Sequence, residues 1–395
     1  MQRHITILGA TGSIGASTMA VVEELRARGE AIEVEAITAG RNVKGLIEAA
    51  LRLRPKFVAS ADPSGLAALR EALVPLGMDV GAGPEAVEEA AARPAPWVMS
   101  AIVGSAALRP TLAALRRGAT VALANKECLV CAGDLVLRTA QDNGARLLPV
   151  DSEHNAIFQV LHHRERVDRM TLTASGGPFR TWTHEQMAAA GPEQACNHPT
   201  WAMGAKISVD SATLMNKGLE LIEAAVLFGM PEDRIDVVVH PQSIVHSLVT
   251  YCDGSTLAQL SPPDMRVPIA FALAWPDRAP IQAKTLDLCL LQQLTFEAPD
   301  AVRFPALGLA RAALRAGGAA TAVLNAANEE AVGAFLERRI RFLEIARVVE
   351  EVLELNAANR LCEVTGAPGS FEEVMRVDGA AREAANRLMT RSRVA

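Results

Sequence analysis

The stretch "ITILGATGSIG", Ile5 to Gly15, joins a short apolar run to a glycine-rich turn. The run is rich in β-branched residues, as strands are, and an amphipathic pattern, "STMAVVEELRAR", follows at 17–28. Glycines at the spacing G-x-x-G-x-x-G let a tight turn approach a pyrophosphate, and the helix that follows offers N–H groups to the anion. The order of strand, glycine turn and helix therefore predicts a dinucleotide site. A glycine-rich turn without a ligand is the alternative.

The same alternation continues through the first 150 residues. Short apolar runs predict six strands: "ITIL" (5–8), "VEAITA" (34–39), "KFVAS" (56–60), "WVMSAI" (97–102), "TVALAN" (120–125) and "RLLPV" (146–150). Amphipathic patterns such as "NVKGLIEAALRL" lie between them. Strands that alternate with helices are typical of a parallel sheet covered by helices. We therefore expect a Rossmann-like, cofactor-binding domain at 1–150.

The pattern changes after residue 150. Loops rich in Gly, Pro and Ser appear, and "SLVTYCDGSTLAQL" at 247–260 predicts a hairpin that turns at Asp253 and Gly254. From about residue 290 the helical period returns, with apolar residues at 345, 348, 349, 352 and 353 on one face. We expect an α/β protein with a central α+β catalytic domain at 151–280. A linker near "WPDRAPIQ" and a C-terminal helical bundle then occupy 281–395.

The composition narrows the class of partner and the compartment. The chain has 395 residues, a formal net charge of -6 and six cysteines. The negative charge argues against nucleic acid or an anionic membrane as the main partner, and so few cysteines do not suggest a disulfide scaffold. No run approaches the ~20 apolar residues of a membrane span, and the N-terminus resembles neither a signal nor a transit peptide. We expect a cytoplasmic protein.

The end of the second predicted strand indicates which dinucleotide binds. An NAD enzyme usually ends this strand in Asp or Glu, which binds the ribose hydroxyl. Here the strand ends in Gly40, Arg41 and Asn42, with an arginine and no acid. A guanidinium suits the 2′-phosphate of NADP, so NADPH is the expected cofactor. An ordinary solvated arginine is the alternative.

The strand "RLLPV" runs directly into Asp151, Ser152, Glu153 and His154. If the chain stays extended there, the carboxylates of Asp151 and Glu153 point the same way. Doubly wound sheets place their sites at the carboxyl ends of the strands, and paired carboxylates suit Mg²⁺ or Mn²⁺ better than zinc. A loop of solvated charges is the alternative.

A second polar block, "HPTWAMGAKISVDSATLMNKGLELIEAA", covers 198–225. Ser211, Asn216 and Lys217 offer hydroxyl, amide and ammonium donors that could collect around a phosphate. Glu220 follows Asn216 by four residues and Lys217 by three, so in a helix the three share one face. Glu220 could then be a third carboxylate ligand of the cation. A capped surface helix with a Lys–Glu pair is the alternative.

Taken together, these segments resemble the 1-deoxy-D-xylulose-5-phosphate reductoisomerases of the non-mevalonate isoprenoid pathway. The matching segments occur in the family's order and cover nearly the whole chain: "GATGSIG" (9–15), "ALANKE" (122–127), "PVDSEH" (149–154), "ASGGPF" (174–179), "HPTWAMGAKISVDSATLMNKGLE" (198–220), "HPQSIVHS" (240–247) and "NAANEEAV" (325–332). Arg41 stands where many members carry Lys, which is a conservative change for phosphate binding.

The resemblance implies a role for each matching polar residue. NADPH would contact Thr11, Gly12, Ser13, Ile14, Gly40, Arg41, Asn42, Asn125, Glu127 and Gly204. The metal would be held by Asp151, Glu153 and Glu220, which with Lys126 would form the catalytic set. The substrate would contact Lys126, Ser152, Glu153, Ser175, His198, Ser211, Asn216, Lys217 and Glu220. The segment 198–204 would be a lid, with Trp201 and Met203 over the substrate.

The resemblance also implies the reaction and the assembly. The family is a homodimer that converts 1-deoxy-D-xylulose 5-phosphate, a small phosphorylated sugar, into 2-C-methyl-D-erythritol 4-phosphate by rearrangement and reduction with NADPH. Two alternatives remain. A semialdehyde dehydrogenase also opens with a "GATG" loop, but it needs a nucleophilic cysteine, for which Cys128 is the candidate. A non-enzymatic NADP-sensing protein would keep the glycine loop and lack a metal site.

Overall fold

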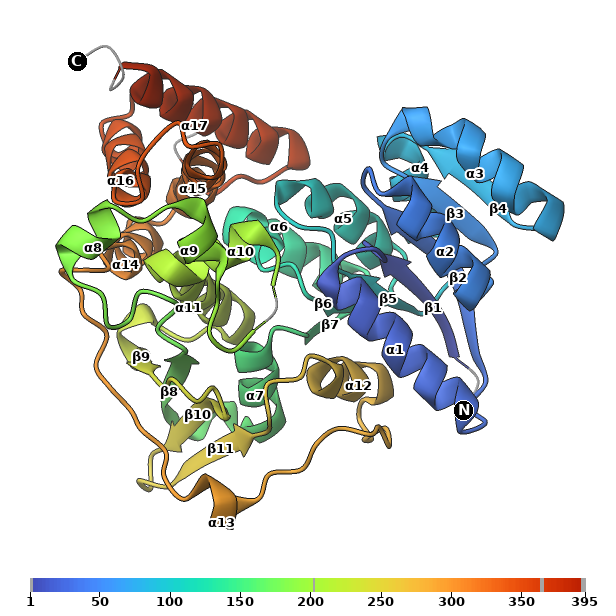
Figure 1. The fold of residues 1–395 in the computed structure, drawn as a ribbon, viewed down its shortest axis with the longest axis horizontal. Helices are drawn as coiled ribbons and strands as arrows, with labels where there is room; N and C mark the ends of the chain where they lie inside the picture. The colour runs from blue at the N-terminus through green and yellow to red at the C-terminus, as the bar shows by residue number, and fades with distance from the viewer. Residues whose placement is uncertain (1–2, 202, 363–365, 392–395) are drawn as a thin grey trace. The chain divides into compact units, whose positions relative to one another are not determined.

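The computed structural model describes residues 3–201, 203–362 and 366–391 (Figure 1). The chain forms two compact units. The first unit contains the described residues up to 128 together with 136–155 and 264–285, and the second contains 129–135, 156–263 and the described residues from 286 onward. The expected division into three domains, at 150 and 280, stays a prediction.

Seven parallel strands form the sheet of the first unit, in the order β4-β3-β2-β1-β5-β6-β7. The strands are β1 Arg3–Leu8, β2 Ile32–Ala39, β3 Phe57–Ser60, β4 Asp79–Ala82, β5 Trp97–Ser100, β6 Thr120–Leu123 and β7 Arg146–Pro149. The chain proceeds outward from β1 to β4 and then returns to β5 on the other side of β1. The structure thus confirms the Rossmann-like parallel sheet, and its strand order switches between β1 and β5.

Helices connect these strands and lie against the sheet (Figure 1). They are α1 Ser13–Ala27, α2 Val43–Leu53, α3 Leu66–Leu73, α4 Pro84–Ala92, α5 Leu108–Arg116 and α6 Glu127–Asp142. From later in the chain, α12 Arg266–Ala274 packs against α1, β6 and β7. Helix α7, Ser152–Val160, follows β7, and its residues from 156 onward belong to the second unit. Strands β3 and β5 are buried along their whole length, as expected of a parallel sheet with both faces covered. This burial explains why the apolar runs predicted the strands.

The sequence prediction missed strand β4. Its four residues, "DVGA", lie at the edge of the sheet, where Asp79 is exposed and the other three are only half-buried. An edge strand buries few side chains, so its sequence carries neither an apolar run nor an enrichment in β-branched residues. Pairing with β3 defines this strand, and its local pattern does not.

A mixed sheet of four strands, in the order β11-β10-β8-β9, forms part of the second unit. The strands are β8 Val167–Ala174, β9 Ile235–Val239, β10 Val245–Tyr251 and β11 Thr256–Leu260. β9 runs parallel to β8, and β10 runs antiparallel to both β8 and β11. The predicted hairpin is confirmed: Gly254 has a φ of +83°, and the N–H of Ser255 donates to Asp253 Oδ1 at 2.9 Å.

The helices of the second unit include the predicted C-terminal bundle. They are α8 His184–Ala188, α9 Pro192–Cys196, α10 Ala205–Thr213, α11 Met215–Phe228, α13 Leu288–Leu291, α14 Ala306–Ala316, α15 Ala320–Leu336, α16 Glu344–Ala357 and α17 Phe371–Arg391. α15 packs against both α16 and α17. On α16 the predicted face is buried at Val348, Val349 and Val352. Among the described residues, no helix is both long enough and apolar enough to cross a membrane.

Helix α11 is fixed against the mixed sheet by its apolar face. Leu221, Ala224 and Phe228 belong to the same buried cluster as Met170 and Leu172 of β8. Full burial of a large apolar side chain contributes about 1.5–3 kcal/mol, so this face holds α11 firmly. The polar residues near the start of the helix therefore have a rigid support.

Candidate active site

The predicted residues of the first unit lie at the carboxyl ends of adjacent strands. Along the sheet order β2-β1-β5-β6-β7, the loops after β2 and β1 carry the predicted cofactor residues. The loops after β6 and β7 carry the predicted catalytic residues. Four interstrand steps of about 4.8 Å separate β2 from β7, or roughly 19 Å. An extended dinucleotide could therefore lie along this edge, across the switch in strand order where such sheets bind ligands.

The glycine-rich turn follows β1. Gly9 has a φ of +89°, and a Cβ there would lie 2.6 Å from the backbone oxygen of Ala101, so the position requires glycine. Gly12 is the N-cap of α1, and in the described part of the chain no side chain caps this helix end. Backbone N–H groups are therefore available to an anion. The predicted pyrophosphate residues all lie here: Thr11, Gly12, Ser13 and Ile14.

The loop after β2 is exposed at Gly40, Arg41 and Asn42. Asn42 caps α2, because its Oδ1 accepts the N–H of Gly45 at 3.0 Å. Arg41 is close to Asp62, which follows β3. Hydrogen bonds from Ser64 and the charge of Arg41 lower the pKa of the Asp62 carboxyl. An acid thus does accompany the arginine, but it comes from the neighbouring strand, which the sequence analysis did not consider.

The loop after β6 is held by Asn125, which is 2% exposed. Its Nδ2 donates to the carbonyl oxygens of Ile102 at 2.6 Å and Gly104 at 3.1 Å, and its Oδ1 accepts the N–H of Cys128 at 2.8 Å. One side chain therefore joins the loop after β5 to the start of α6. Two residues after Asn125, Glu127 is the buried first residue of α6.

Lys126 and Asp151 form an ion pair that links the ends of β6 and β7. The side chains are 6% and 16% exposed, respectively. Taking such charges out of water costs several kcal/mol per ion, which only good pairing offsets. The pair thus keeps a buried ammonium and a carboxylate together at the predicted reacting end.

The expectation of an extended chain at 151–154 is wrong. Helix α7 begins at Ser152, and the N–H of Asn155 donates to the carbonyl oxygen of Asp151 at 2.8 Å. Asp before the first turn and Glu within it are typical of a helix N-terminus, a signal that the prediction overlooked. Asp151 and Glu153 nevertheless have carboxylate oxygens within 4.8 Å of each other, and the hydroxyl of Ser152 donates to Glu153.

In the second unit, the loop after β8 brings Ser175 to His198. Ser175 Oγ lies 2.9 Å from His198 Nε2, and His198 Nδ1 accepts the backbone N–H groups of Thr200 and Trp201 at 3.1 and 2.9 Å. Nδ1 therefore carries no proton, and Nε2–H donates to the serine. Burial lowers the pKa of His198, so the neutral ring leaves the hydroxyl proton of Ser175 available to an acceptor such as phosphate.

Two glycines after Ser175 bring this loop to the end of α10. Gly177 has a φ of +67°, and a Cβ there would lie 2.5 Å from the backbone oxygen of Ser211. Only glycine permits so close an approach. Ser211 itself is 9% exposed. The structure thus brings together two of the predicted phosphate donors, which are 36 residues apart in the sequence.

Helix α11 places Asn216, Lys217 and Glu220 on one face, as the spacing predicted. Asn216 Nδ2 donates to Glu220 Oε1 at 2.5 Å, and the ammonium of Lys217 donates to the other carboxylate oxygen. The side chains of Lys217 and Glu220 are 4% and 1% exposed. The alternative of a solvated surface pair is therefore wrong, because this ion pair is buried.

The predicted lid joins α9 to α10. His198 and Trp201 are half-buried, as is Met203, and Gly204 is the exposed N-cap of α10. His246 of β10 is not among the predicted site residues, yet its ring centroid lies 6.3 Å from that of Trp201. Burial, assisted by the charge of Lys217, lowers the pKa of His246 to about 4. A neutral imidazole thus lies beside the tryptophan of the lid.

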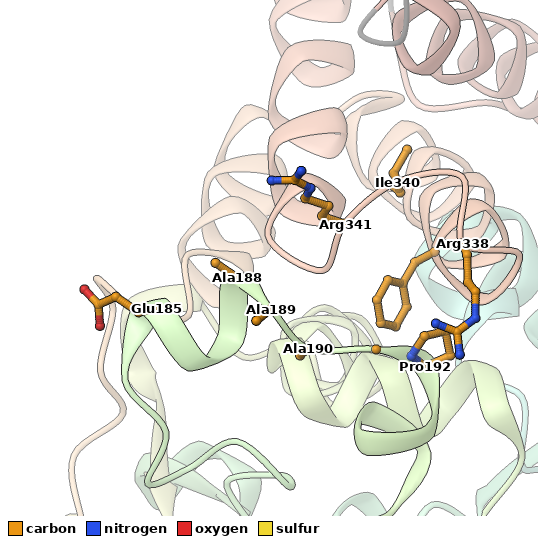
Figure 2. A pocket seen from close by; sticks show the side chains of 10 residues that line it. Glu185, Ala188, Ala189, Ala190, Pro192, Arg338, Ile340 and Arg341 are labelled. Atoms are coloured by element: carbon orange, nitrogen blue, oxygen red, sulfur yellow. The ribbon is translucent and has the colours of Figure 1, made fainter.

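A cavity of about 580 Å³ lies elsewhere in the second unit, between the α8–α9 segment and the end of α15 (Figure 2). Its lining includes Glu185, Arg338 and Arg341 with an apolar floor at Phe335. Arg338 is paired with Glu193 at 2.5 Å. None of the predicted site residues lines this cavity, so it is separate from the candidate active site.

Three family models match this chain in succession. They describe 1-deoxy-D-xylulose 5-phosphate reductoisomerase at 5–133, its C-terminal domain at 147–228 and the DXP reductoisomerase C-terminal domain at 260–384. The 1-deoxy-D-xylulose 5-phosphate reductoisomerase of Caulobacter vibrioides is 57% identical, covering 99% of this chain and 98% of the relative. The Rhodospirillum centenum enzyme is 56% identical, covering 99% and 95%.

Solved structures of reductoisomerases are also similar to this chain. The reductoisomerase of Zymomonas mobilis in complex with NADPH is 51% identical, with a TM-score of 0.90 and coverage of 98% of this chain and 99% of that one. A DOX-P reductoisomerase in complex with NADPH, fosmidomycin and magnesium is 42% identical, with a TM-score of 0.93 and coverage of 99% and 98%. The chain therefore belongs to the 1-deoxy-D-xylulose 5-phosphate reductoisomerase family.

Proposed function

We propose that this protein is an NADPH-dependent oxidoreductase of isoprenoid precursor biosynthesis. It converts 1-deoxy-D-xylulose 5-phosphate into 2-C-methyl-D-erythritol 4-phosphate, and it requires a divalent metal ion. The observation that carries this conclusion is the family match along nearly the whole chain, at 57% identity to one relative. NADPH and magnesium are the ligands of a related solved structure.

We propose that the metal ion is Mg²⁺ or Mn²⁺ and that Asp151 and Glu153 bind it. Their oxygens lie within 4.8 Å of each other, which suits one hard cation because each ligand lies about 2.0–2.6 Å from such an ion. The family resemblance adds Glu220 as the third ligand. When bound, the cation would supply Lewis-acid stabilisation of negative charge on a substrate oxygen.

Lys126 acts beside these carboxylates at the reacting end. Its ammonium is buried against Asp151, which holds that carboxylate in place. The ammonium also provides a positive centre near the oxygen on which charge develops. Ser152, at the first position of α7, completes the polar surface that meets the reacting carbons.

The other end of the substrate is bound through its phosphate. Ser175, Ser211, Asn216 and Lys217 donate to it, and His198 orients the hydroxyl of Ser175. Binding energy from this remote group positions the reacting end. Trp201 and Met203 cover the substrate when the lid closes, because the rearranging fragments must not meet water.

Cofactor choice follows from the loop after β2. Arg41 is exposed and can reach a 2′-phosphate, while the N-terminus of α1 receives the pyrophosphate. Asn125 and Glu127 border the nicotinamide end, and Gly204 touches the cofactor from the lid. These assignments put the hydride donor beside the catalytic residues after β6 and β7.

We further propose a cytoplasmic homodimer. None of the six cysteines, all of which the structure describes, lies in a disulfide, as is usual in a reducing compartment. The edge strand β11 exposes Leu257 and Leu260, and α13 exposes Leu288 and Leu290. Exposed strand edges with apolar side chains tend to pair with another chain. Sedimentation should give twice the chain mass, and a monomer at micromolar concentration would refute the dimer.

The experiment that tests the activity is the loss of NADPH absorbance with 1-deoxy-D-xylulose 5-phosphate and Mg²⁺ or Mn²⁺. The semialdehyde dehydrogenase alternative is disfavoured, because Cys128 is fully buried beside Thr111 and a buried thiol is a poor nucleophile. Rapid loss of activity on treatment with a thiol reagent would instead support a semialdehyde dehydrogenase. A protein that only senses NADP would leave NADPH unchanged in the same assay.

A further inference from the structure

The segment "NAANEEAV", 325–332, lies on α15 and has no role in the proposed function. Asn328 of this segment is fully buried, and its Nδ2 donates to Asp210 Oδ1 of α10 at 2.8 Å. The other carboxylate oxygen of Asp210 lies 2.9 Å from the ammonium of Lys206, one turn earlier in α10. A buried carboxylate is thus held between an amide on α15 and an ammonium on its own helix.

The orientation of this amide is determined by its surroundings. Asp210 is 1% exposed, and a buried carboxylate is tolerated only when it is paired and hydrogen-bonded. If the amide of Asn328 were flipped, its oxygen would face the carboxylate. In the part of the chain that the structure describes, nothing donates to Asn328 Oδ1. Asn328 therefore contributes its donor to this contact, at the cost of a buried acceptor that receives no hydrogen bond.

Helix α10 needs such an external support. It has nine residues, too few to be stable without tertiary contacts. The predicted lid enters at its start, since Gly204 is the N-cap. At its end Leu214 has a φ of +61°, a left-handed conformation that is costly for a non-glycine residue. Neither end of α10 is therefore well suited to fix the position of the helix, whereas its contact with α15 is buried.

Asp210 directly precedes Ser211, and α11 with Asn216 and Lys217 follows Leu214. A rotation or shift of α10 would therefore move the hydroxyl of Ser211 and the attachment point of the lid together. A group that must bind phosphate has to be placed within about 0.5 Å. The contact between α15 and α10 (Figure 1) is well placed to supply this precision.

We propose that Asn328 is a positioning residue for recognition of the substrate phosphate. Together with Lys206 it holds Asp210, and through Asp210 it sets the position of α10, of Ser211 and of the base of the lid. This inference rests on the proposed function. The expected effect is selective: recognition of the phosphorylated substrate should weaken most, whereas NADPH binding, which apart from Gly204 uses residues of the first unit, should change little.

The test exchanges the two partners. Asn328→Asp alone places two carboxylates in contact, and Asp210→Asn alone leaves one amide oxygen to accept from both Asn328 and Lys206. Each should raise the KM for 1-deoxy-D-xylulose 5-phosphate about tenfold, a coupling of ~1.4 kcal/mol. The KM for NADPH should change less than about threefold. In the double variant the amide at 210 donates through Nδ2 to a carboxylate at 328 and accepts from Lys206 through Oδ1, so the substrate KM should return to within about threefold of the wild type.

Asn325→Leu is the matched control. Asn325 is also fully buried on α15, but its amide donates to Glu329 at 3.1 Å. This variant should share any loss in melting temperature without the change in substrate KM. Unchanged substrate KM in the single variants, equal effects of the control, or no recovery in the double variant would each overturn the inference. An inactive wild type would instead refute the proposed function.

Discussion

His246 offers a prediction whose size follows from its surroundings. The residue is 5% exposed, and burial, together with the charges of Lys217 and His240, lowers its pKa from 6.5 to about 4. The unfolded chain therefore binds a proton on this ring near pH 6.5, whereas the folded protein binds it only near pH 4. Since the unfolded state takes up the proton first, the stability that this ring contributes is present above pH 6.5 and is lost as the pH falls toward 4.

The resulting change in the free energy of unfolding can be calculated for the interval from pH 7 to pH 5. One pKa unit corresponds to about 1.4 kcal/mol. Most of the 1.5 pH units between pH 6.5 and pH 5 contribute this full amount, because there the unfolded chain holds the proton and the folded protein does not. The free energy of unfolding should therefore fall by about 2 kcal/mol between pH 7 and pH 5 on account of this ring alone. Other titrating groups add their own contributions, so a matched variant is needed to isolate this one.

His246→Gln is that variant. Glutamine can still hydrogen-bond Ser261, which lies 2.9 Å from His246 Nε2 through its Oγ, but it cannot take up a proton. Urea unfolding of both proteins at pH 7, 6 and 5 gives the two pH dependences. We expect the variant to lose about 2 kcal/mol less than the wild type over this interval. Parallel pH dependences would show that the ring titrates normally, and would refute the burial argument.

Three further predictions concern the site. Arg41→Ala should weaken NADPH binding roughly ten- to hundredfold, because a charge-assisted hydrogen bond contributes about 1.5–3 kcal/mol; NADH should be little affected, and equal losses by both cofactors in equilibrium titrations would contradict the 2′-phosphate contact. Asp151→Asn should lower turnover on the order of a thousandfold or more, since Lewis-acid stabilisation is worth several kcal/mol; NADPH affinity, measured by fluorescence, should hardly change, and near-normal turnover would exclude Asp151 as a ligand of the catalytic metal. The segment 198–204 should become less sensitive to protease when NADPH and a substrate analogue bind together, whereas an unchanged cleavage rate would argue against a lid.

The sequence predicted the architecture well where periodicity decides it. Alternating strands and helices, the hairpin at Asp253 and Gly254 and the C-terminal helices each follow from local patterns. The edge strand β4 and the helix that begins at Ser152 did not, for different reasons. The strand has almost no local pattern, whereas the helix start carries an acidic capping signal at Asp151 and Glu153, two residues whose spacing also fits an extended chain.

For the site, spacing along one helix predicted the shared face of Asn216, Lys217 and Glu220. Partners that come from distant segments could not be predicted in this way. The contact of Asn328 with Asp210 spans 118 residues, and the charge of Arg41 acts on Asp62, which follows the neighbouring strand. Such pairs depend on strand order and helix packing, which a single sequence does not encode in any local spacing.

This chain reduces 1-deoxy-D-xylulose 5-phosphate with NADPH at a metal-dependent site. The most direct measurement follows NADPH absorbance in the presence of that substrate, first after treatment with excess chelator and then after addition of Mg²⁺ or Mn²⁺. We expect no consumption of NADPH in chelator, and full, reversible recovery on addition of the metal, with 2-C-methyl-D-erythritol 4-phosphate as the product. Full activity in excess chelator, or no activity with substrate, metal and NADPH all present, would contradict the account.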